Sequence, residues 1–436
     1  MNYVANTLEH YWMPFTANRD FKENPRLIVK AEGMYYTTHR GDTVLDGSAG
    51  LFCVAAGHGR REIADAVARQ FMELDYGPPF QFSHPAVFEL SRRLSEILPD
   101  GMNHVFYANS GSEAVESALK IALAYQRARG QGTRQRLVGR ERAYHGVNFG
   151  GLSVAGLVKN REAFGLGLPG AVHLRHTWLP EQRFSRGQPE AGAMLADDLQ
   201  RFVDLHGADN IAACIVEPIA GSCGCQVPPK GYLERLREIC DRHGILLIFD
   251  EVITGFGRTG NGFAPQSFGV TPDIMTMAKA LTNGNVPMGA VAVRDAVYDT
   301  VIDAAPEGSI ELFHGYTYSG CPVAVAAALA TLDIYAKEDL FARAGAMSPY
   351  FLDAVFGLRE FDVVTDIRGY GMLAAFDVAP DGGPGARGYE ILKRLYEKGL
   401  LVKVTGDSIL LSPPLIAEQS HIDEMADKLR AVIGSL

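Results

Sequence analysis

The feature that most restricts the fold of this chain is an alternation of short apolar runs with longer helical patterns, between about residues 100 and 300. The apolar runs predict strands at 104–107, 136–138, 212–216, 245–249 and 274–277. Between them, apolar residues recur at helical spacing in 112–126 and 232–243. Strands that alternate with helices pair in parallel and are covered on both faces, so this part predicts an α/β domain with a mainly parallel sheet.

The pattern changes after Thr317. It predicts helices at 322–337, 341–358 and 421–433 and shorter strands at 371–377 and 408–411. These elements indicate a smaller α+β domain, built from residues 1–55 and 321–436, beside a large domain formed by 56–320.

The balance of charges argues against a nucleic-acid partner. The chain has 41 Lys and Arg against 51 Asp and Glu, a net charge of −10, whereas binding to a phosphate backbone relies on clustered basic residues. The longest apolar stretch, 322–332, is too short to cross a bilayer. The opening MNYVANTLEHYW lacks the basic and apolar regions of a signal peptide. We therefore expect a cytoplasmic protein that does not contact a membrane.

The six cysteines are scattered in or beside apolar runs, which is typical of a reducing compartment rather than of a disulfide framework. Cys223 and Cys225 form a Cys-Gly-Cys motif. Because no second Cys or His pair stands at ligand spacing nearby, we expect no metal site.

The segment GFGRTG at 255–260 matches the dinucleotide fingerprint G-x-G-x-x-G. In a nucleotide site the first glycine directly follows a strand and a helix begins at the third. Here five residues separate the predicted strand 245–249 from the motif, and two prolines and a glycine interrupt the segment that follows it. The motif therefore predicts a flexible loop, and a nucleotide-dependent oxidoreductase is the weaker hypothesis.

Polar residues follow four of the predicted strands. Asp250 follows 245–249, Glu217 follows 212–216, and Lys279 follows DIMTMA. The strand predicted at 104–107 leads into NSGSE at 109–113, where small residues at a helix start suit a bound phosphate. In open α/β sheets, ligands bind beyond the carboxyl ends of the strands. Each feature alone has an ordinary structural explanation: a helix cap, a solvated carboxylate or a surface lysine.

Together these groups favour pyridoxal phosphate as the ligand. A lysine with a lowered pKa reacts with the aldehyde of this cofactor, and a buried carboxylate keeps its ring nitrogen protonated. The helix start receives the phosphate. We therefore assign Lys279 to the aldehyde and Asp250 to the ring nitrogen.

With these residues in place, the chain resembles the class III aminotransferases, which are fold-type-I pyridoxal-phosphate enzymes. The stretch IFDEVITGFGRTG, followed by Pro272-Asp273 and MAKALTNG, is similar to the signature of the family. Similar blocks are NSGSEAVESALK at 109–120, YHG at 144–146, EPIAGSCG at 217–224, HGYTYSG at 314–320 and GDSILLSPPL at 406–415. YWMPFTANRDFKENPRLI and LDYGPPFQFSHP most resemble the ω-amino acid (β-alanine):pyruvate branch.

The resemblance implies roles for individual residues. Lys279 would hold the cofactor covalently and later move a proton, Asp250 would bind the ring nitrogen, and Glu217 would orient the site near the cofactor's 3′ oxygen. Tyr144 and Val252 would cover the two faces of the ring. The remaining cofactor contacts would come from Ser110, Gly111, Ser112, His145 and the partner subunit's Thr317. A homodimer, or a tetramer built from it, is therefore implied.

The same resemblance implies a substrate pocket lined by Phe15, Leu51, Phe52, Phe80 and Ser222. Relatives often have Trp at the position of Phe52 and Ala at that of Ser222, so the pocket is expected to be slightly roomier or more polar. Relatives also commonly have an arginine where this chain has Lys403. Lysine lacks the planar fork of arginine, so a substrate carboxylate would be held by a single ion pair.

We therefore expect an aminotransferase that moves an amino group from an ω-amino acid or primary amine, such as β-alanine, to pyruvate. The products would be an aldehyde or ketone and alanine. Alternatives of the same fold are an aminotransferase for diamines, polyamines or other acceptors, and an aminomutase or racemase. A non-enzymatic binding protein has no support in the sequence.

Overall fold

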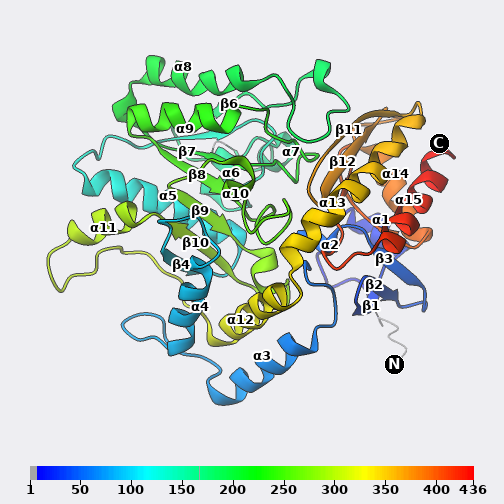
Figure 1. The fold of residues 1–436 in the computed structure, drawn as a ribbon, viewed down its shortest axis with the longest axis horizontal. Coiled ribbons are helices and arrows are strands. Elements are labelled where there is room, and N and C mark those ends of the chain that lie inside the picture. The colour runs from blue at the N-terminus through cyan, green and yellow to red at the C-terminus, as the bar shows by residue number, and fades with distance from the viewer. Residues whose placement is uncertain (1–6, 166) are drawn as a thin grey trace.

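The computed structural model describes residues 7–165 and 167–436. At the centre of this part of the chain lies a seven-stranded sheet (Figure 1). Its strands are β4 (His104–Ala108), β5 (Arg136–Arg140), β6 (Val172–Leu174), β7 (Ile211–Val216), β8 (Leu246–Asp250), β9 (Ile274–Met277) and β10 (Gly289–Val293). Their order is β4-β10-β9-β8-β7-β5-β6, and within the described ranges only β10 runs against its neighbours. The predicted α/β fold with a mainly parallel sheet is confirmed.

Helices cover both faces of this sheet because its strands carry apolar residues on both sides. Along β7, Ala213 and Ile215 belong to one buried cluster, whereas Cys214 and Val216 belong to another. The first cluster includes α5 (Gly111–Ala128), and the second includes α9 (Tyr232–His243) and α12 (Pro322–Lys337). A strand buried on both faces has a continuous apolar sequence, as in IAACIV.

The unit built on the central sheet has further helices, which are short or pack outside the helices named above. α3 (Arg61–Glu73) and α4 (Pro85–Ser95) pack against α12, and α8 (Asp197–His206) packs against α9. The others are α6 (Phe149–Val154), α7 (Val158–Arg161), α10 (Ala264–Phe268) and α11 (Asp295–Asp303). In the described part of the chain no helix combines the length and the apolarity needed to span a bilayer.

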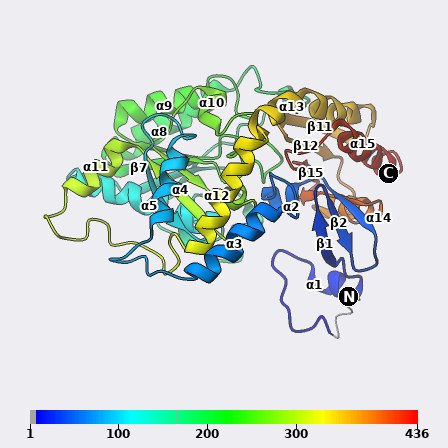
Figure 2. The ribbon, with the colours of Figure 1, turned by 60° about the horizontal axis from the view of Figure 1, so that its bottom comes forward.

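Two four-stranded sheets lie beside this unit, where the N-terminal and C-terminal parts of the chain come together (Figures 1 and 2). One has the order β1-β2-β3-β13 and consists of β1 (Ile28–Glu32), β2 (Tyr35–Thr38), β3 (Thr43–Asp46) and β13 (Leu400–Leu401). The other has the order β11-β12-β15-β14 and consists of β11 (Val364–Tyr370), β12 (Leu373–Val378), β14 (Lys403–Thr405) and β15 (Ser408–Leu411). The helices of this region are α1 (Asn18–Glu23), α2 (Ala49–Phe52), α13 (Leu340–Phe356), α14 (Ala386–Glu397) and α15 (Gln419–Ile433).

The pairing of β3 with β13 joins the first 50 or so residues to the last quarter of the chain. Leu400 lies opposite Leu45, and Leu401 lies opposite Asp46, in parallel register. This pairing supports one part of the division that we propose, a small domain of residues 1–55 and 321–436 beside a large domain of 56–320, because it joins the two ends of the small domain. α12, although it lies within 321–436, packs against α3 and α4 of the central unit.

The GFGRTG segment forms a tightly packed turn. Arg258 is buried, and its guanidinium donates hydrogen bonds to the carbonyl groups of Ser412 and Pro413. Gly257 has φ +98°, and a Cβ built on it would lie 2.6 Å from a Leu415 methyl group. The sequence predicts a flexible loop here; the segment is a loop, but the flexibility is a wrong expectation, because burial makes it a rigid contact between chain segments. No helix begins at its third glycine, Gly260, because α10 begins only at Ala264.

Candidate active site

The carboxyl edge of the central sheet borders a cavity of about 320 Å³. Because β4, β7, β8 and β9 run in the same direction, the residues that follow them lie at the same edge. The cavity is lined by residues 109–112, 144–146, Glu217, Asp250, Val252 and Lys279, among others. The four strand ends singled out in the sequence therefore meet in one place.

Asp250 is the last residue of β8 and is only 6% exposed. Its Oδ2 lies 2.8 Å from Nδ1 of His145. Its Oδ1 accepts hydrogen bonds of 3.1 Å from the Val252 amide and from the Thr276 hydroxyl. These three partners fix the direction of the carboxylate. His145 is itself buried, and within the described ranges its Nε2 has no hydrogen-bond partner.

Lys279 follows β9 and opens a single 3₁₀ turn, Lys279–Thr282. Its φ of +46° lies in the left-handed region, which is costly for a residue with a side chain and is common at functional sites. Burial lowers the pKa of Lys279, although the charges of Cys53, Asp250 and Glu217 oppose the shift. A lowered pKa increases the fraction of neutral amine, which is the nucleophilic form.

Glu217 follows β7 and is 3% exposed. Its Oε1 accepts a 2.8 Å hydrogen bond from the amide of Tyr144, so the two cavity walls are tied together. Burial raises the pKa of Glu217 to about 7, with the charge of His145 acting in the opposite direction. Glu217 thus positions the backbone that carries the Tyr144 ring, which is half-buried in the cavity.

The N-terminus of α5 supplies an anion-binding end to the cavity. Ser110 caps the helix, because its Oγ accepts a 3.2 Å hydrogen bond from the amide of Glu113. Ser112 Oγ accepts a 3.1 Å bond from the amide of Val147. A Cβ on Gly111 would lie 3.0 Å from a Val252 methyl group, so the helix start is held close to that side chain. The amides of the first helical turn have no partners within a helix and attract negative charge.

Other predicted site residues lie outside the lining of this cavity. Phe15 and Leu51 are 79% and 62% exposed and line a second cavity of about 490 Å³. Phe52 is buried in the core. Phe80 is largely exposed, and a Cβ on Gly315 would lie 2.7 Å from its ring. The substrate role of these aromatic residues stays a prediction.

Thr317 is exposed, and its carbonyl oxygen accepts a 3.0 Å hydrogen bond from the Tyr76 hydroxyl. Ser222 is buried in the loop that follows Glu217. Lys403 lies half-buried on β14 and donates a 2.9 Å hydrogen bond to the Thr405 hydroxyl. None of these three lines the main cavity, so their roles also stay predictions.

The structure adds residues to the site that the sequence reasoning missed. Cys53 lines the cavity from the N-terminal part of the chain, and Thr276 supports Asp250 from β9. A polar residue inside the apolar run IMTM was a usable signal for Thr276. Cys53 had no such signal. Within the described ranges no group of three or more His, Cys, Asp or Glu residues is arranged to hold a metal ion.

The donor set of the cavity fits pyridoxal phosphate. The α5 N-terminus suits the phosphate, the buried Asp250 carboxylate suits the ring nitrogen, and the Lys279 amine suits the aldehyde. When bound, the cofactor supplies an electrophilic aldehyde and a ring that accepts an electron pair.

Comparison with known proteins agrees with this fit. The family model "Aminotransferase class-III" matches residues 16–433, and the chain belongs to this pyridoxal-phosphate-dependent family. It is 55% identical to an omega-aminotransferase of Caulobacter vibrioides, covering 100% of this chain and 99% of the relative. It is 46% identical to a beta-alanine–pyruvate aminotransferase of Pseudomonas aeruginosa, over 98% and 96% of the two chains. The crystal structure of an amine transaminase from an uncultivated Pseudomonas species, in its PLP-bound form, superposes with a TM-score of 0.93 at 36% identity, covering 99% of each chain.

Glu251, the neighbour of Asp250, leads to a prediction about stability. It is buried, and its oxygens accept hydrogen bonds from the amide of Ala264 at 2.8 Å and from the hydroxyl of Thr254 at 2.5 Å. Burial raises the pKa of Glu251 from 4.5 to about 8. The folded protein therefore holds a proton that the unfolded chain releases, so the stabilisation is full below about pH 4.5 and is lost as the pH rises to about 8.

A glutamine at this position does not titrate: its carbonyl oxygen can accept the bond from the Ala264 amide, and its NH2 group can donate to the Thr254 oxygen. We expect Glu251→Gln to gain stability over the wild type as the pH rises from about 5 to about 9, by several kcal/mol at about 1.4 kcal/mol per pKa unit. Chemical denaturation at several pH values measures this difference. A difference that is constant with pH would contradict the assignment.

Proposed function

We propose that this protein transfers an amino group from an ω-amino acid such as β-alanine, or from another primary amine, to pyruvate. The products are an aldehyde or ketone and alanine. The main support is the meeting of Lys279, Asp250 and the α5 N-terminus in one cavity. The relatives named omega-aminotransferase and beta-alanine–pyruvate aminotransferase, which match along almost their whole lengths, support the choice of substrates.

In this proposal Lys279 would hold the cofactor through its amine and would also move a proton to and from the substrate Cα. Its lowered pKa increases the fraction of neutral amine that can accept a proton. Asp250 keeps the ring nitrogen protonated, and His145 and Thr276 hold Asp250 in place. Tyr144 and Val252, which line the cavity, would cover the ring, and Ser110, Gly111 and Ser112 would bind the phosphate.

We propose further that the active form is a homodimer in which the partner subunit's Thr317 completes the phosphate site. Several observations support it. Thr317 is exposed, and its carbonyl oxygen accepts a hydrogen bond from the Tyr76 hydroxyl. The centre of the Tyr76 ring lies 5.9 Å from that of the Tyr318 ring. Large apolar side chains close to this segment are also exposed: Phe313 is 87% exposed, and Phe80, whose ring lies against Gly315, is 55% exposed. Exposed apolar patches of this kind usually mark an interface.

The proposed substrate pocket combines Phe15, Leu51, Phe52, Phe80, Ser222 and Lys403. The electrostatics of Lys403 support it: burial lowers its pKa, Lys279 lowers it further and Glu217 raises it, so these groups interact. We also propose a cytoplasmic location, which the six free cysteines support.

The function is tested by incubating the purified protein with β-alanine and pyruvate and measuring alanine. We expect alanine to form, and the protein to show the visible absorbance of bound cofactor. Benzylamine in place of β-alanine separates general amine transfer from recognition of an ω-carboxylate. A coloured protein that forms no alanine from either donor would show that the proposal is wrong.

A further inference from the structure

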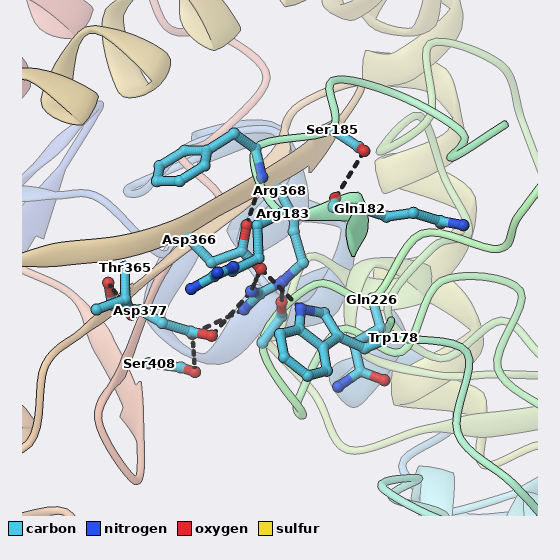
Figure 3. A network of polar contacts seen from close by, with 12 residues as sticks. Trp178, Gln182, Arg183, Ser185, Gln226, Thr365, Asp366, Arg368, Asp377 and Ser408 are labelled. Atoms are coloured by element: carbon cyan, nitrogen blue, oxygen red, sulfur yellow. Dashed lines mark hydrogen bonds and ion pairs between the residues drawn. The ribbon is translucent and has the colours of Figure 1, made fainter. Parts of the chain in front are cut away.

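A buried arginine, Arg368 on β11, lies at the centre of a polar network outside the cavity (Figure 3). Its guanidinium donates to Asp377 through two hydrogen bonds of 2.8 and 2.7 Å and also pairs with Asp366. The Arg368 Nε donates a 2.8 Å bond to the carbonyl oxygen of Gly224. The planar fork of arginine is required to reach three partners at once.

The two carboxylates of this network have further partners. Asp366 accepts a 2.8 Å hydrogen bond from the indole of Trp178 and a 2.6 Å bond from the amide of Phe184. Asp377 accepts a hydrogen bond from the hydroxyl of Ser408 on β15. A buried network with its members satisfied holds a single geometry, so the carbonyl of Gly224 has a fixed anchor.

Gly224 belongs to the loop 221–225, which follows Glu217 and carries Ser222. It has φ +95°, and a Cβ built on it would lie 2.9 Å from the Arg368 Nη2, so the close approach depends on glycine. At the other end of the loop, a Cβ on Gly221 would lie 2.9 Å from the side chain of Ile253, which lines the cavity. The loop is thus held between Arg368 and the cavity wall.

The network also reaches the strand that carries Lys403. Ser408, the partner of Asp377, lies opposite Thr405 in the β14–β15 pair. Lys403 donates its hydrogen bond to that same Thr405. A Cβ built on Gly224 would lie 3.1 Å from the Ser408 Oγ, so the loop packs against the β14–β15 hairpin that carries Lys403.

We propose that Arg368 is a positioning residue that fixes loop 221–225 against the Lys403 strand and thereby sets recognition of the substrate carboxylate. The inference rests on the proposed function, because it takes the Lys403 side of the site as the carboxylate-binding side. Arg368 touches neither cofactor nor substrate in this arrangement. It acts through the carbonyl of Gly224 and the carboxylate of Asp377.

The test is steady-state kinetics of Arg368→Lys, which keeps the charge but loses the fork. We expect the KM for pyruvate to rise about tenfold or more, because small displacements of binding groups are costly, while the KM for benzylamine, which has no carboxylate, changes less than about threefold. Gly224→Ala perturbs the same contact from the loop side and should give the same pattern. It also serves if Arg368→Lys does not fold.

Arg134→Lys is the matched control. Arg134 is also buried and donates hydrogen bonds to four carbonyl groups, those of Ala208, Ile211, His243 and Gly244, but it does not line the cavity. This variant should lose thermal stability without a selective change in the KM for pyruvate.

A double-mutant cycle with Lys403→Ala then tests the route. If Arg368 acts through the Lys403 side, Arg368→Lys should add little to the pyruvate KM once Lys403 is gone. Equal changes in the two KM values, behaviour like that of Arg134→Lys, or full additivity with Lys403→Ala would overturn the inference. A wild-type protein that forms no alanine at all would instead remove the proposed function.

Discussion

Replacement of Lys279 by alanine is expected to lower alanine formation by about 10⁴-fold or more, because one amine serves both as the nucleophile and as the base. Among the described residues Lys279 is the one lysine that lines the cavity. Its left-handed backbone and lowered pKa show an amine held in a strained, water-poor position. Arginine at this position stays protonated and would not restore the activity.

The measurement combines turnover with chemical trapping. Borohydride reduction of the wild type should leave the cofactor covalently attached to the peptide that contains Lys279, and the variant should carry no such label. Lys120→Ala is the control and should behave as the wild type. Lys120 lies at an exposed position on α5, away from the helix start that borders the cavity. A label on another lysine, or turnover that survives the loss of Lys279, would contradict the assignment.

Asp250→Asn is expected to lower kcat by about 10³-fold. An amide has nearly the same shape as a carboxylate but no charge, so it does not hold a proton on the ring nitrogen. The bonds from Thr276 and Val252 to Oδ1 remain available to an amide oxygen, so the fold and the shape of the cavity should persist. Stopped-flow kinetics of each half-reaction measures the loss.

Asp273→Asn is the matched control for this substitution. Asp273 is nearly buried, pairs with Arg237 and accepts a 2.7 Å hydrogen bond from the amide of Leu247. It precedes β9, and its loss should therefore reduce stability rather than kcat. Equal rates for Asp250→Asn and the wild type, with cofactor bound in both, would show that Asp250 has no role at the ring nitrogen.

Elements with a strong local pattern could be predicted from the sequence. β9, α9, α12 and β15 begin and end where the apolar periodicity indicates. The strand β10, Gly289–Val293, carries no such signal, because its alternating glycine, alanine and valine residues suit several structures. It is defined by pairing with β9 on one side and with β4 on the other. β4 lies far from both strands in the chain.

The same distinction, between residues marked by a local pattern and residues placed by distant contacts, holds for the site. Asp250, Glu217 and Lys279 could be found because each follows an apolar run, and the carboxyl ends of parallel strands share one edge. The network of Arg368 could not be found, because its partner Gly224 is 144 positions away. Thr317 and Phe80 are exposed in a single chain, so nothing within one chain determines their role.

The pairing of β3 with β13 has a consequence for synthesis of the protein on the ribosome. β3, Thr43–Asp46, is made long before its partner, Leu400–Leu401, because the whole central sheet lies between them in the chain. Contacts over such a separation form slowly, and an open strand edge invites aggregation. The edge of β3 therefore needs cover, from a chaperone or from the folded middle segment of the nascent chain, until Leu400–Leu401 has been made.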